Sequence, residues 1–427
     1  MNNKGKIFAW TLFDFANTAF SVIIVTVIYS KYFSGYVAGG KNWLWGLSVS
    51  ISMALSAILS PPLGAIADSS RNRKRFLLVF TCVSVICTAL MFFVHKGYVL
   101  SGMTLFILAN IGFEGGLVFY DAFLPNLTEK KNFGRVSGYG FAMGYLGALT
   151  VLIIVMLILP EQSSPDYYFY IRLTFLVAAA FFLLFSIPMF LFIHEPGNES
   201  RLRTGLIKAG VRKSFSTFKD LFFKNNYPSV SRFLLAFFLY NDAVITIIAF
   251  ASIFASNILK MTDAQVIYFF AIVQSTAVAG SFIFGIISDH IGPKKTIMIT
   301  LVIWIAVISG AFFIQTVFEF YIIGLLAGLS IGSSQSCSRS LMALLTPKER
   351  EAEFFGFYDG LFGKSSAIIG PLLYGAIADI SNERFAVLAI GCFFIAGLFL
   401  LKKVEEPEYK QKDITPHKYQ VQDKLSS

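Results

Sequence analysis

The sequence predicts an all-α membrane protein with twelve transmembrane helices. The chain has 427 residues, of which 56% are hydrophobic and only 14% are charged, and its mean hydropathy is +0.68. Soluble domains carry about 25% charged residues, so this chain has too few polar side chains for a soluble globule. Apolar runs of about 20 residues recur along its whole length, and a helix of that length crosses a bilayer core.

Short polar or turn-forming segments separate the apolar runs. Backbone groups inside lipid must form their hydrogen bonds within the segment, so we expect each isolated run to be a helix. The first run has no cleavage pattern of a signal peptide, and we count it as a permanent span. The predicted spans are residues 8–33, 43–67, 76–95, 100–124, 137–160, 168–193, 230–257, 264–288, 296–316, 319–345, 354–378 and 384–402.

The placement of the basic residues predicts that both termini lie in the cytoplasm. If the N-terminus is inside, 27 of the 35 Lys and Arg residues fall in the termini and inner connections, and six fall in the outer connections. Lys and Arg favour cytoplasmic connections. We therefore interpret the net charge of +10 as a signal of orientation rather than of nucleic-acid binding. In a bacterium, the expected location is the inner membrane.

The longest connection divides the chain into two six-helix halves. Residues 1–193 form the N-terminal half, residues 230–404 form the C-terminal half, and residues 194–229 form a cytoplasmic linker. Apolar side chains recur at helical spacing in the linker, with Lys and Arg on its other faces. This pattern favours an amphipathic helix on the anionic inner leaflet, and a plain charged linker is the alternative. Residues 405–427 are polar, and we expect a disordered cytoplasmic tail.

The two halves repeat short motifs at nearly constant spacing. Gly64 and Asp68 close the second span, and Gly285 and Asp289 close the eighth span 221 residues later (285 − 64 and 289 − 68). Basic residues follow both pairs, beginning with Arg71 in the first copy. A Leu-Thr…Gly motif repeats at an offset of 218, and an asparagine inside a span repeats at an offset of 224. These offsets predict a duplicated six-helix unit.

The Gly-x-x-x-Asp motif with its basic cluster resembles the loop motif of the major facilitator superfamily. The first copy departs from that motif, because Ser69 and Ser70 stand where a basic residue and a spacer are usual. Further segments resemble the vacuolar-effluxer-like (autophagy-related permease) branch: FDFAN at 13–17, YND at 240–242, SRS at 338–340 and EAEFFGFY at 351–358. The resemblance covers all twelve spans. It implies a major facilitator fold of two pseudo-symmetric halves and export of amino acids or similar solutes.

Ionisable residues inside the predicted spans are the candidates for a substrate and coupling site, because a charge in lipid is costly and usually functional. Glu114, Asp242 and Lys364 lie well inside their spans, and Asp14 lies nearer the start of the first span. The resemblance implies that spans one, four, seven and eleven line a central cavity near the membrane midplane. Neutral side chains that could orient a ligand there are Asn17, Tyr240, Asn241 and Tyr358.

The expected mechanism uses Glu114 or Asp242 as a carboxylate that binds and releases a proton. Lys364 would pair with a carboxylate of the substrate, or with an acidic residue when the site is empty. The alternative is that these charges pair internally and hold helices together. For Asp14, favourable electrostatics at a helix start or simple packing is a further alternative.

Asp68 and Asp289 are expected at a cytoplasmic gate, together with Gly64, Arg71 and Gly285. In the superfamily pattern, each aspartate faces the N-terminus of a helix in the other half, where the helix dipole favours a carboxylate.

Asp121 and Arg339 occupy equivalent positions in the repeat (339 − 121 = 218). We hypothesise that these two side chains attract each other across the halves when the gate is closed. The competing arrangement pairs Asp121 with Arg71 or Arg73 inside its own half.

The sequence therefore favours a monomeric secondary transporter that moves a small, amino-acid-like solute by alternating access with proton coupling. An uncoupled uniporter and a lipid or drug transporter of the same fold are the alternatives. A membrane enzyme is not expected, because no catalytic cluster is visible. No metal or cofactor is expected either, because the four cysteines lie inside apolar runs without the spacing of metal ligands.

Overall fold

The computed structural model describes residues 3–161, 163–195 and 206–407, so most of the tail expected at 405–427 lies outside the described residues. The described chain is almost wholly helical. The long helices of the first half are α1 (Asn3–Phe20), α3 (Asn42–Ser70), α4 (Arg73–Leu90), α5 (Val99–Asp121), α7 (Phe133–Ile158) and α8 (Tyr167–Phe192). Those of the second half are α10 (Pro228–Ile258), α11 (Asp263–Ile291), α12 (Pro293–Phe313), α13 (Val317–Leu345) and α16 (Glu383–Lys402).

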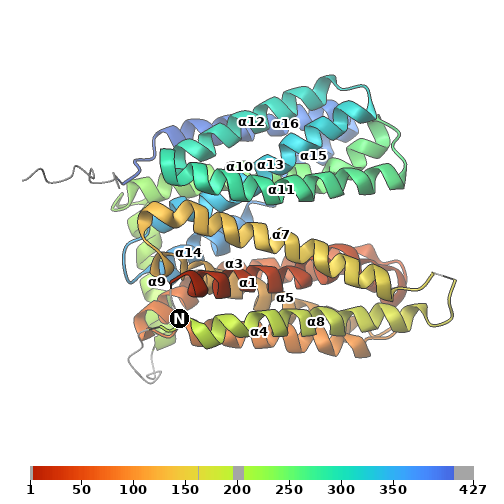
Figure 1. Ribbon diagram of the computed structural model, residues 1–427, viewed down its shortest axis with the longest axis horizontal. Helices are drawn as coiled ribbons and strands as arrows, with labels where there is room; N and C mark the ends of the chain where they lie inside the picture. Colours follow the sequence, from red (N-terminus) through yellow and green to blue (C-terminus); the bar gives the residue numbers. More distant parts are fainter. Residues whose placement is uncertain (1–2, 162, 196–205, 408–427) are drawn as a thin grey trace, which may run out of the picture.

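The shorter helices connect or complete the long ones. They are α2 (Tyr29–Lys31), α6 (Leu124–Leu127), α9 (Leu206–Phe222), α14 (Glu351–Phe355) and α15 (Ile369–Ile380). Figure 1 shows two bundles of roughly parallel helices, with the first half of the chain below and the second half above.

Eleven helical segments of the described chain are long and apolar enough to cross a membrane. The first, Asn3–Val37, is longer than the expected span 8–33 because π-helical turns continue α1. The expected span 354–378 is broken instead of continuous: α14 passes into a π-helical stretch, η5 (Gly356–Gly363), and a non-helical break at 366–368 precedes α15. Glycines weaken a helix, and Pro371 removes a backbone donor just after the break.

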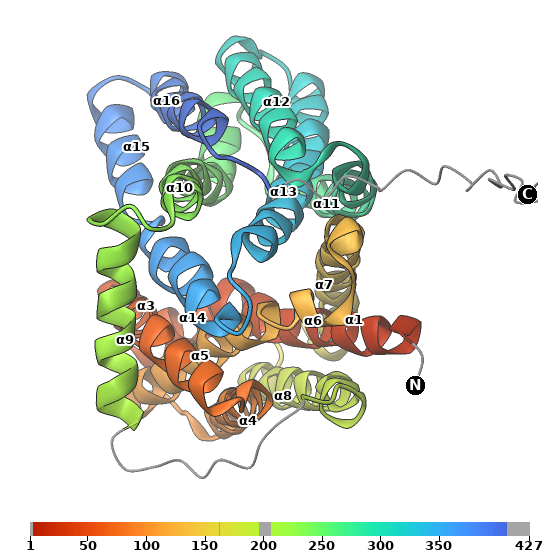
Figure 2. The same cartoon turned by 90° about the vertical axis from the view of Figure 1, so that its left-hand side faces the viewer.

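Helix α9, the start of α1 and the end of α16 all lie at one end of the bundles, on the left of Figure 1. We call this the α9 end and the opposite side the far end. Both views show α9 running across the spans rather than along them (Figures 1 and 2).

The two bundles approach each other most closely at the α9 end. A Cβ atom added to Gly64 of α3 would lie 2.2 Å from the carbonyl oxygen of Ala352 in α14. In the other pair of helices, a Cβ atom on Gly285 of α11 would lie 2.8 Å from the carbonyl oxygen of Gly134 in α7. The two contacts are related by the sequence repeat (352 − 134 = 218). Figure 1 shows α7 and α11 side by side near the α9 end and diverging toward the far end.

Candidate functional site

A cavity of about 950 Å³ lies between the two bundles. Side chains from α1, α3, α5 and α7 line it on one side, and side chains from α10, α13 and the broken span line it on the other. This volume is in the range that small-molecule sites occupy. Six of the eight predicted substrate-site residues line the cavity: Asp14, Glu114, Tyr240, Asn241, Tyr358 and Lys364.

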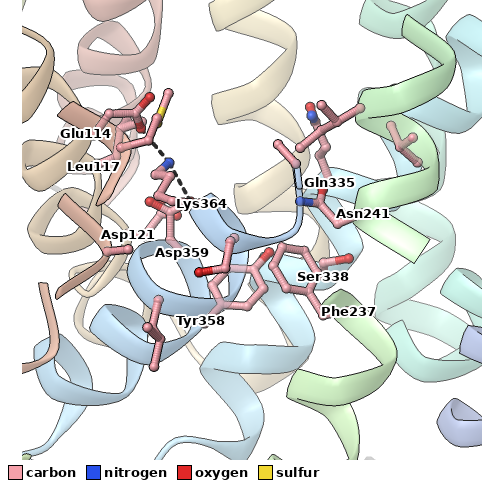
Figure 3. Close-up of a pocket in the computed structure, with 18 of the residues that line it drawn as sticks. Glu114, Leu117, Asp121, Phe237, Asn241, Gln335, Ser338, Tyr358, Asp359 and Lys364 are labelled. Carbon is pink, nitrogen blue, oxygen red and sulfur yellow. Dashed lines mark hydrogen bonds and ion pairs between the residues drawn. The ribbon is translucent and has the colours of Figure 1, made fainter. Parts of the chain in front are cut away.

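Lys364 forms the charged centre of the cavity. Its ammonium makes an ion pair with Glu114 of α5 and lies 3.4 Å from Oδ1 of Asp359 in η5 (Figure 3). The side chains of Lys364 and Glu114 are only 13% and 8% exposed. An unpaired charge at such a position would be strongly destabilising, so the two carboxylates stabilise the ammonium. The Glu114–Lys364 pair also links the two halves of the chain.

Neutral polar groups line the cavity beside this charged centre. The hydroxyls of Tyr240 and Ser338 form a hydrogen bond of 2.7 Å. The side-chain amide of Asn241 donates to the hydroxyl of Ser366 at 2.6 Å. Ser366 begins the break in the eleventh span, so Asn241 ties α10 to that break.

The remaining wall of the cavity is apolar. Its residues come mainly from α3 and α10, and they include Val49, Met53, Ala54, Ala57, Ile58, Phe237, Val244 and Ile245. Charged groups on one side and aliphatic or aromatic side chains on the other suit a solute with a polar head and an apolar portion.

Arg339 of α13 lines the cavity together with Asp14 and Asp121. Its guanidinium donates to Asp121 at 2.8 Å and to Asp14 at 3.2 Å. It also donates to the hydroxyl and the carbonyl oxygen of Ser137, at 2.9 and 2.8 Å. All three partners belong to the other half of the chain, and Arg339 is only 1% exposed. The structure therefore pairs Asp121 with Arg339 across the halves.

Asp14 belongs to the same network. Its carboxylate accepts a hydrogen bond of 2.7 Å from the hydroxyl of Tyr120 as well as the bond from Arg339. Electrostatics at the start of α1 therefore do not explain this residue, because its charge is bound by a cation of the other half.

Asp68 and Asp289 lie closer to the α9 end, each against the first turn of a helix in the opposite half. Asp68 accepts hydrogen bonds from the backbone N–H groups of Ala352 and Glu353 at 3.1 and 2.8 Å. Asp289 accepts one from the backbone N–H of Arg135 at 3.2 Å. The first N–H groups of a helix lack partners inside the helix and carry partial positive charge, so these carboxylates stabilise both helix starts.

A buried arginine accompanies Asp68, but it is Arg73 rather than the predicted Arg71. Nε of Arg73 lies 2.7 Å from Asp68, and the same guanidinium pairs with Glu351 of the other half. Arg71 is exposed and lies 3.6 Å from the exposed Glu349. Glu349 belongs to the other half, so Arg71 also pairs across the halves, but at the surface, and its role at the gate stays a prediction. The chain turns at Arg71 in a left-handed conformation, and the next helix starts at Arg73.

Asp242 and Asn17 are not among the cavity-lining residues, contrary to our expectation. Asp242 is fully buried, and both of its carboxylate oxygens accept from the backbone N–H of Gly370 at 3.0 and 2.9 Å. It therefore holds the first turn of α15 after the break. Asn17 is 5% exposed on α1, and its amide nitrogen has no hydrogen-bond partner in the described part of the chain.

Sequence reasoning missed Asp359, Gln335 and Glu353. Asp359 is an ionisable residue inside a predicted span, so the same search that found Lys364 could have found it. Gln335 lines the cavity but is neutral and carries no such signal. Glu353 lies in a motif that we had noted, yet its burial follows only from the packing of α14.

Two bundles with a cavity between them, closed at one end by carboxylates that bind helix starts of the opposite half, define a transporter of the major facilitator superfamily. Solved structures share this fold. The human organic anion transporter MFSD10 superimposes with a TM-score of 0.73 at 13% identity, covering 94% of this chain and 100% of that one. The Escherichia coli fucose:proton symporter FucP superimposes with a TM-score of 0.72 at 14% identity, covering 95% and 98%.

The chain belongs to the vacuole effluxer Atg22-like family, whose sequence model matches residues 45–412. It is 31% identical over 418 residues to the MFS-type transporter YxiO of Bacillus subtilis, covering 95% of this chain and 96% of that protein. It is 24% identical over 472 residues to autophagy-related protein 22 of Yarrowia lipolytica, covering 89% and 79%. The predicted fold and family resemblance are confirmed, and the protein is an integral, multi-pass membrane transporter rather than an enzyme.

Proposed function

We propose that the protein is a secondary active transporter of a small, amino-acid-like solute, with the α9 end in the cytoplasm. The observation that carries this proposal is the cavity with the Glu114–Lys364–Asp359 cluster in its wall. The buried ion pairs of Arg339 and Asp68 lie on the α9 side of this cavity. In this arrangement the solute exchanges with the far side, and separation of these pairs would expose the cavity to the cytoplasm.

The chemistry of the cluster supports a zwitterionic solute. The ammonium of Lys364 can bind a carboxylate, while Glu114 and Asp359 can bind an amine. The apolar wall on α3 and α10 would then hold the side chain of the solute. Six predicted residues in one cavity are consistent with this role, and the description of the family as vacuole effluxer-like supports export.

The number of charges in the cluster supports proton coupling. Two carboxylates share one ammonium. Protonation of Glu114 would leave Lys364 paired with Asp359, and it would free one face of the ammonium for the solute. We choose Glu114 over Asp242 for this step, because Asp242 binds the start of α15.

Transport into proteoliposomes tests the proposal. A panel of labelled amino acids should include at least one that the purified protein moves, and an imposed pH gradient should increase its accumulation. Movement of no amino acid under either condition would exclude the amino-acid-like substrate. Amino-acid transport that does not depend on the pH gradient would instead indicate an uncoupled uniporter.

A substitution tests the coupling residue in the same vesicles. Glu114→Gln should preserve exchange of the solute but remove its response to the pH gradient. Glu161→Gln, an exposed position outside the cavity, is the matched control and should respond like the unmodified protein. If the Glu114 variant keeps the pH response, another group carries the proton.

A further inference from the structure

Helix α9 packs against the protein with a face of small and apolar residues. Gly210, Ser214, Thr217 and Leu221 are buried on this face. Gly210 lies so close to α3 that an added Cβ atom would be 2.3 Å from the side chain of Ile66. The linker helix therefore packs closely against the end of α3.

The same face of α9 holds a carboxylate of the gate. Glu353 is fully buried in the first turn of α14, and its carboxylate accepts from the hydroxyl of Thr217 at 2.5 Å and from Arg350 at 3.0 Å. The ammonium of Lys213 lies 3.8 Å from it. The backbone N–H of Glu353 donates to Asp68 of the first half. One residue thus joins the linker helix to both halves at the point where the gate closes.

The opposite face of α9 is exposed and combines apolar with basic side chains. Val211 and Phe215 are 51% and 60% exposed, and Lys208, Arg212 and Lys219 are exposed beside them. The ammonium of Lys219 lies 4.8 Å from the centre of the Phe215 ring. Helices with this composition lie in the interface of a membrane, with apolar side chains at the acyl boundary and cations at the headgroups.

The position of α9 agrees with such a placement. Figure 2 shows it at the edge of the bundles, lying across the spans with one side turned away from the protein. A Cβ atom added to Gly210 would meet the carbonyl oxygen of Pro62 and the side chain of Ile66, two residues one to two turns before α3 ends at Ser70. The exposed face of α9 therefore lies near the level of the lipid headgroups when α3 crosses the membrane.

We propose that this face binds anionic phospholipid headgroups, and that bound lipid holds α9 on Glu353 and so favours the closed gate. Opening the α9 end requires α14 to leave Asp68, and Glu353 moves with α14. A helix held in the membrane plane by its cations resists that movement through Thr217. Electrostatic attraction to an anionic surface strengthens binding by roughly fivefold for each Lys or Arg.

Distances between spin labels test the proposal without any solute, so the result does not depend on the transport proposal. The labels are placed at Glu129→Cys and Lys348→Cys, two exposed positions of opposite halves at the α9 end, in a protein whose four native cysteines are replaced by alanine. Vesicles of phosphatidylcholine are compared with vesicles that also contain phosphatidylglycerol. The ratio of closed to open populations should rise about tenfold or more with the anionic lipid. Inorganic phosphate added to phosphatidylcholine vesicles should not reproduce the rise.

Two triple variants identify the surface that senses the lipid. K208Q/R212Q/K219Q removes the exposed cations of α9 and should bring the ratio within about twofold of its value in phosphatidylcholine. K130Q/K402Q/K403Q removes the same charge from exposed positions elsewhere at this end and should keep the full response. Equal responses of the two variants would overturn the assignment to α9. The proposal that anionic lipid is the ligand would be overturned if the unmodified protein did not respond to phosphatidylglycerol. It would also be overturned if a soluble acidic protein produced an equal response in phosphatidylcholine vesicles.

Thr217→Val separates lipid binding from its effect on the gate. A fluorophore on Ser216→Cys reports contact of the exposed face with lipid. Its emission should shift with phosphatidylglycerol whether position 217 is unmodified or carries the substitution. The shift in populations should be lost in the Thr217→Val variant alone. If the Thr217→Val variant keeps both the emission shift and the shift in populations, α9 does not act through Glu353.

Discussion

Removing the charge of Arg339 should shift the protein toward a state that is open at the α9 end. Arg339 holds Asp14 and Asp121 of the other half in a site where it is only 1% exposed. Arg339→Gln keeps much of the side-chain volume and two donors, but it leaves both carboxylates without their cation. Both carboxylates are buried while the gate is closed, whereas an open gate would hydrate them.

The size of the shift follows from this burial. Breaking a buried ion pair by removing one partner costs about 3–5 kcal/mol. The cost falls on the closed state, and about 1.4 kcal/mol corresponds to a factor of ten in a population ratio. The ratio of closed to open populations should therefore fall by about 150- to 4000-fold.

The spin-label pair at positions 129 and 348 measures this ratio in vesicles of constant composition. The triple variant D14N/D121N/R339Q removes the stranded charges and should recover most of the closed population. Arg384→Gln is the matched control, because the guanidinium of Arg384 binds three carbonyl oxygens at the end of α12 and lies away from the gate. A folded Arg339→Gln protein with unchanged populations, or a triple variant as open as the single one, would refute the reasoning.

Three further outcomes are expected. Gly64→Ala should open the gate in the same distance measurement, because its Cβ would lie 2.2 Å from a carbonyl oxygen of α14, whereas Gly35→Ala, with nothing within 4 Å, should have no effect. Lys364→Gln should lower the free energy of unfolding by about 3–5 kcal/mol, and adding Glu114→Gln should restore part of it in thermal unfolding. Asp242→Asn should cost about 1.5–3 kcal/mol of stability through its weakened bonds to α15, while the pH dependence of transport stays unchanged.

The sequence alone determined the class of fold, because a membrane imposes strong physical constraints on it. Each span must be long enough to cross the lipid and must satisfy its own backbone, so composition and run length reveal it. The constant offsets between Gly64 and Gly285 and between Asp68 and Asp289 then showed the duplication. The structure places those four residues in matching contacts at one end of the bundles.

Only the tertiary structure decided which charges meet. Successive residues of a helix point about 100° apart, so Asn241 lines the cavity while Asp242 binds the start of α15. The pairs that matter join residues far apart in the chain, such as Arg339 with Asp14 and Lys364 with Glu114. Their geometry depends on how two bundles pack and where the eleventh span breaks. Local periodicity contains no information about either, which is why the sequence found most of the candidates but only the structure showed their partners.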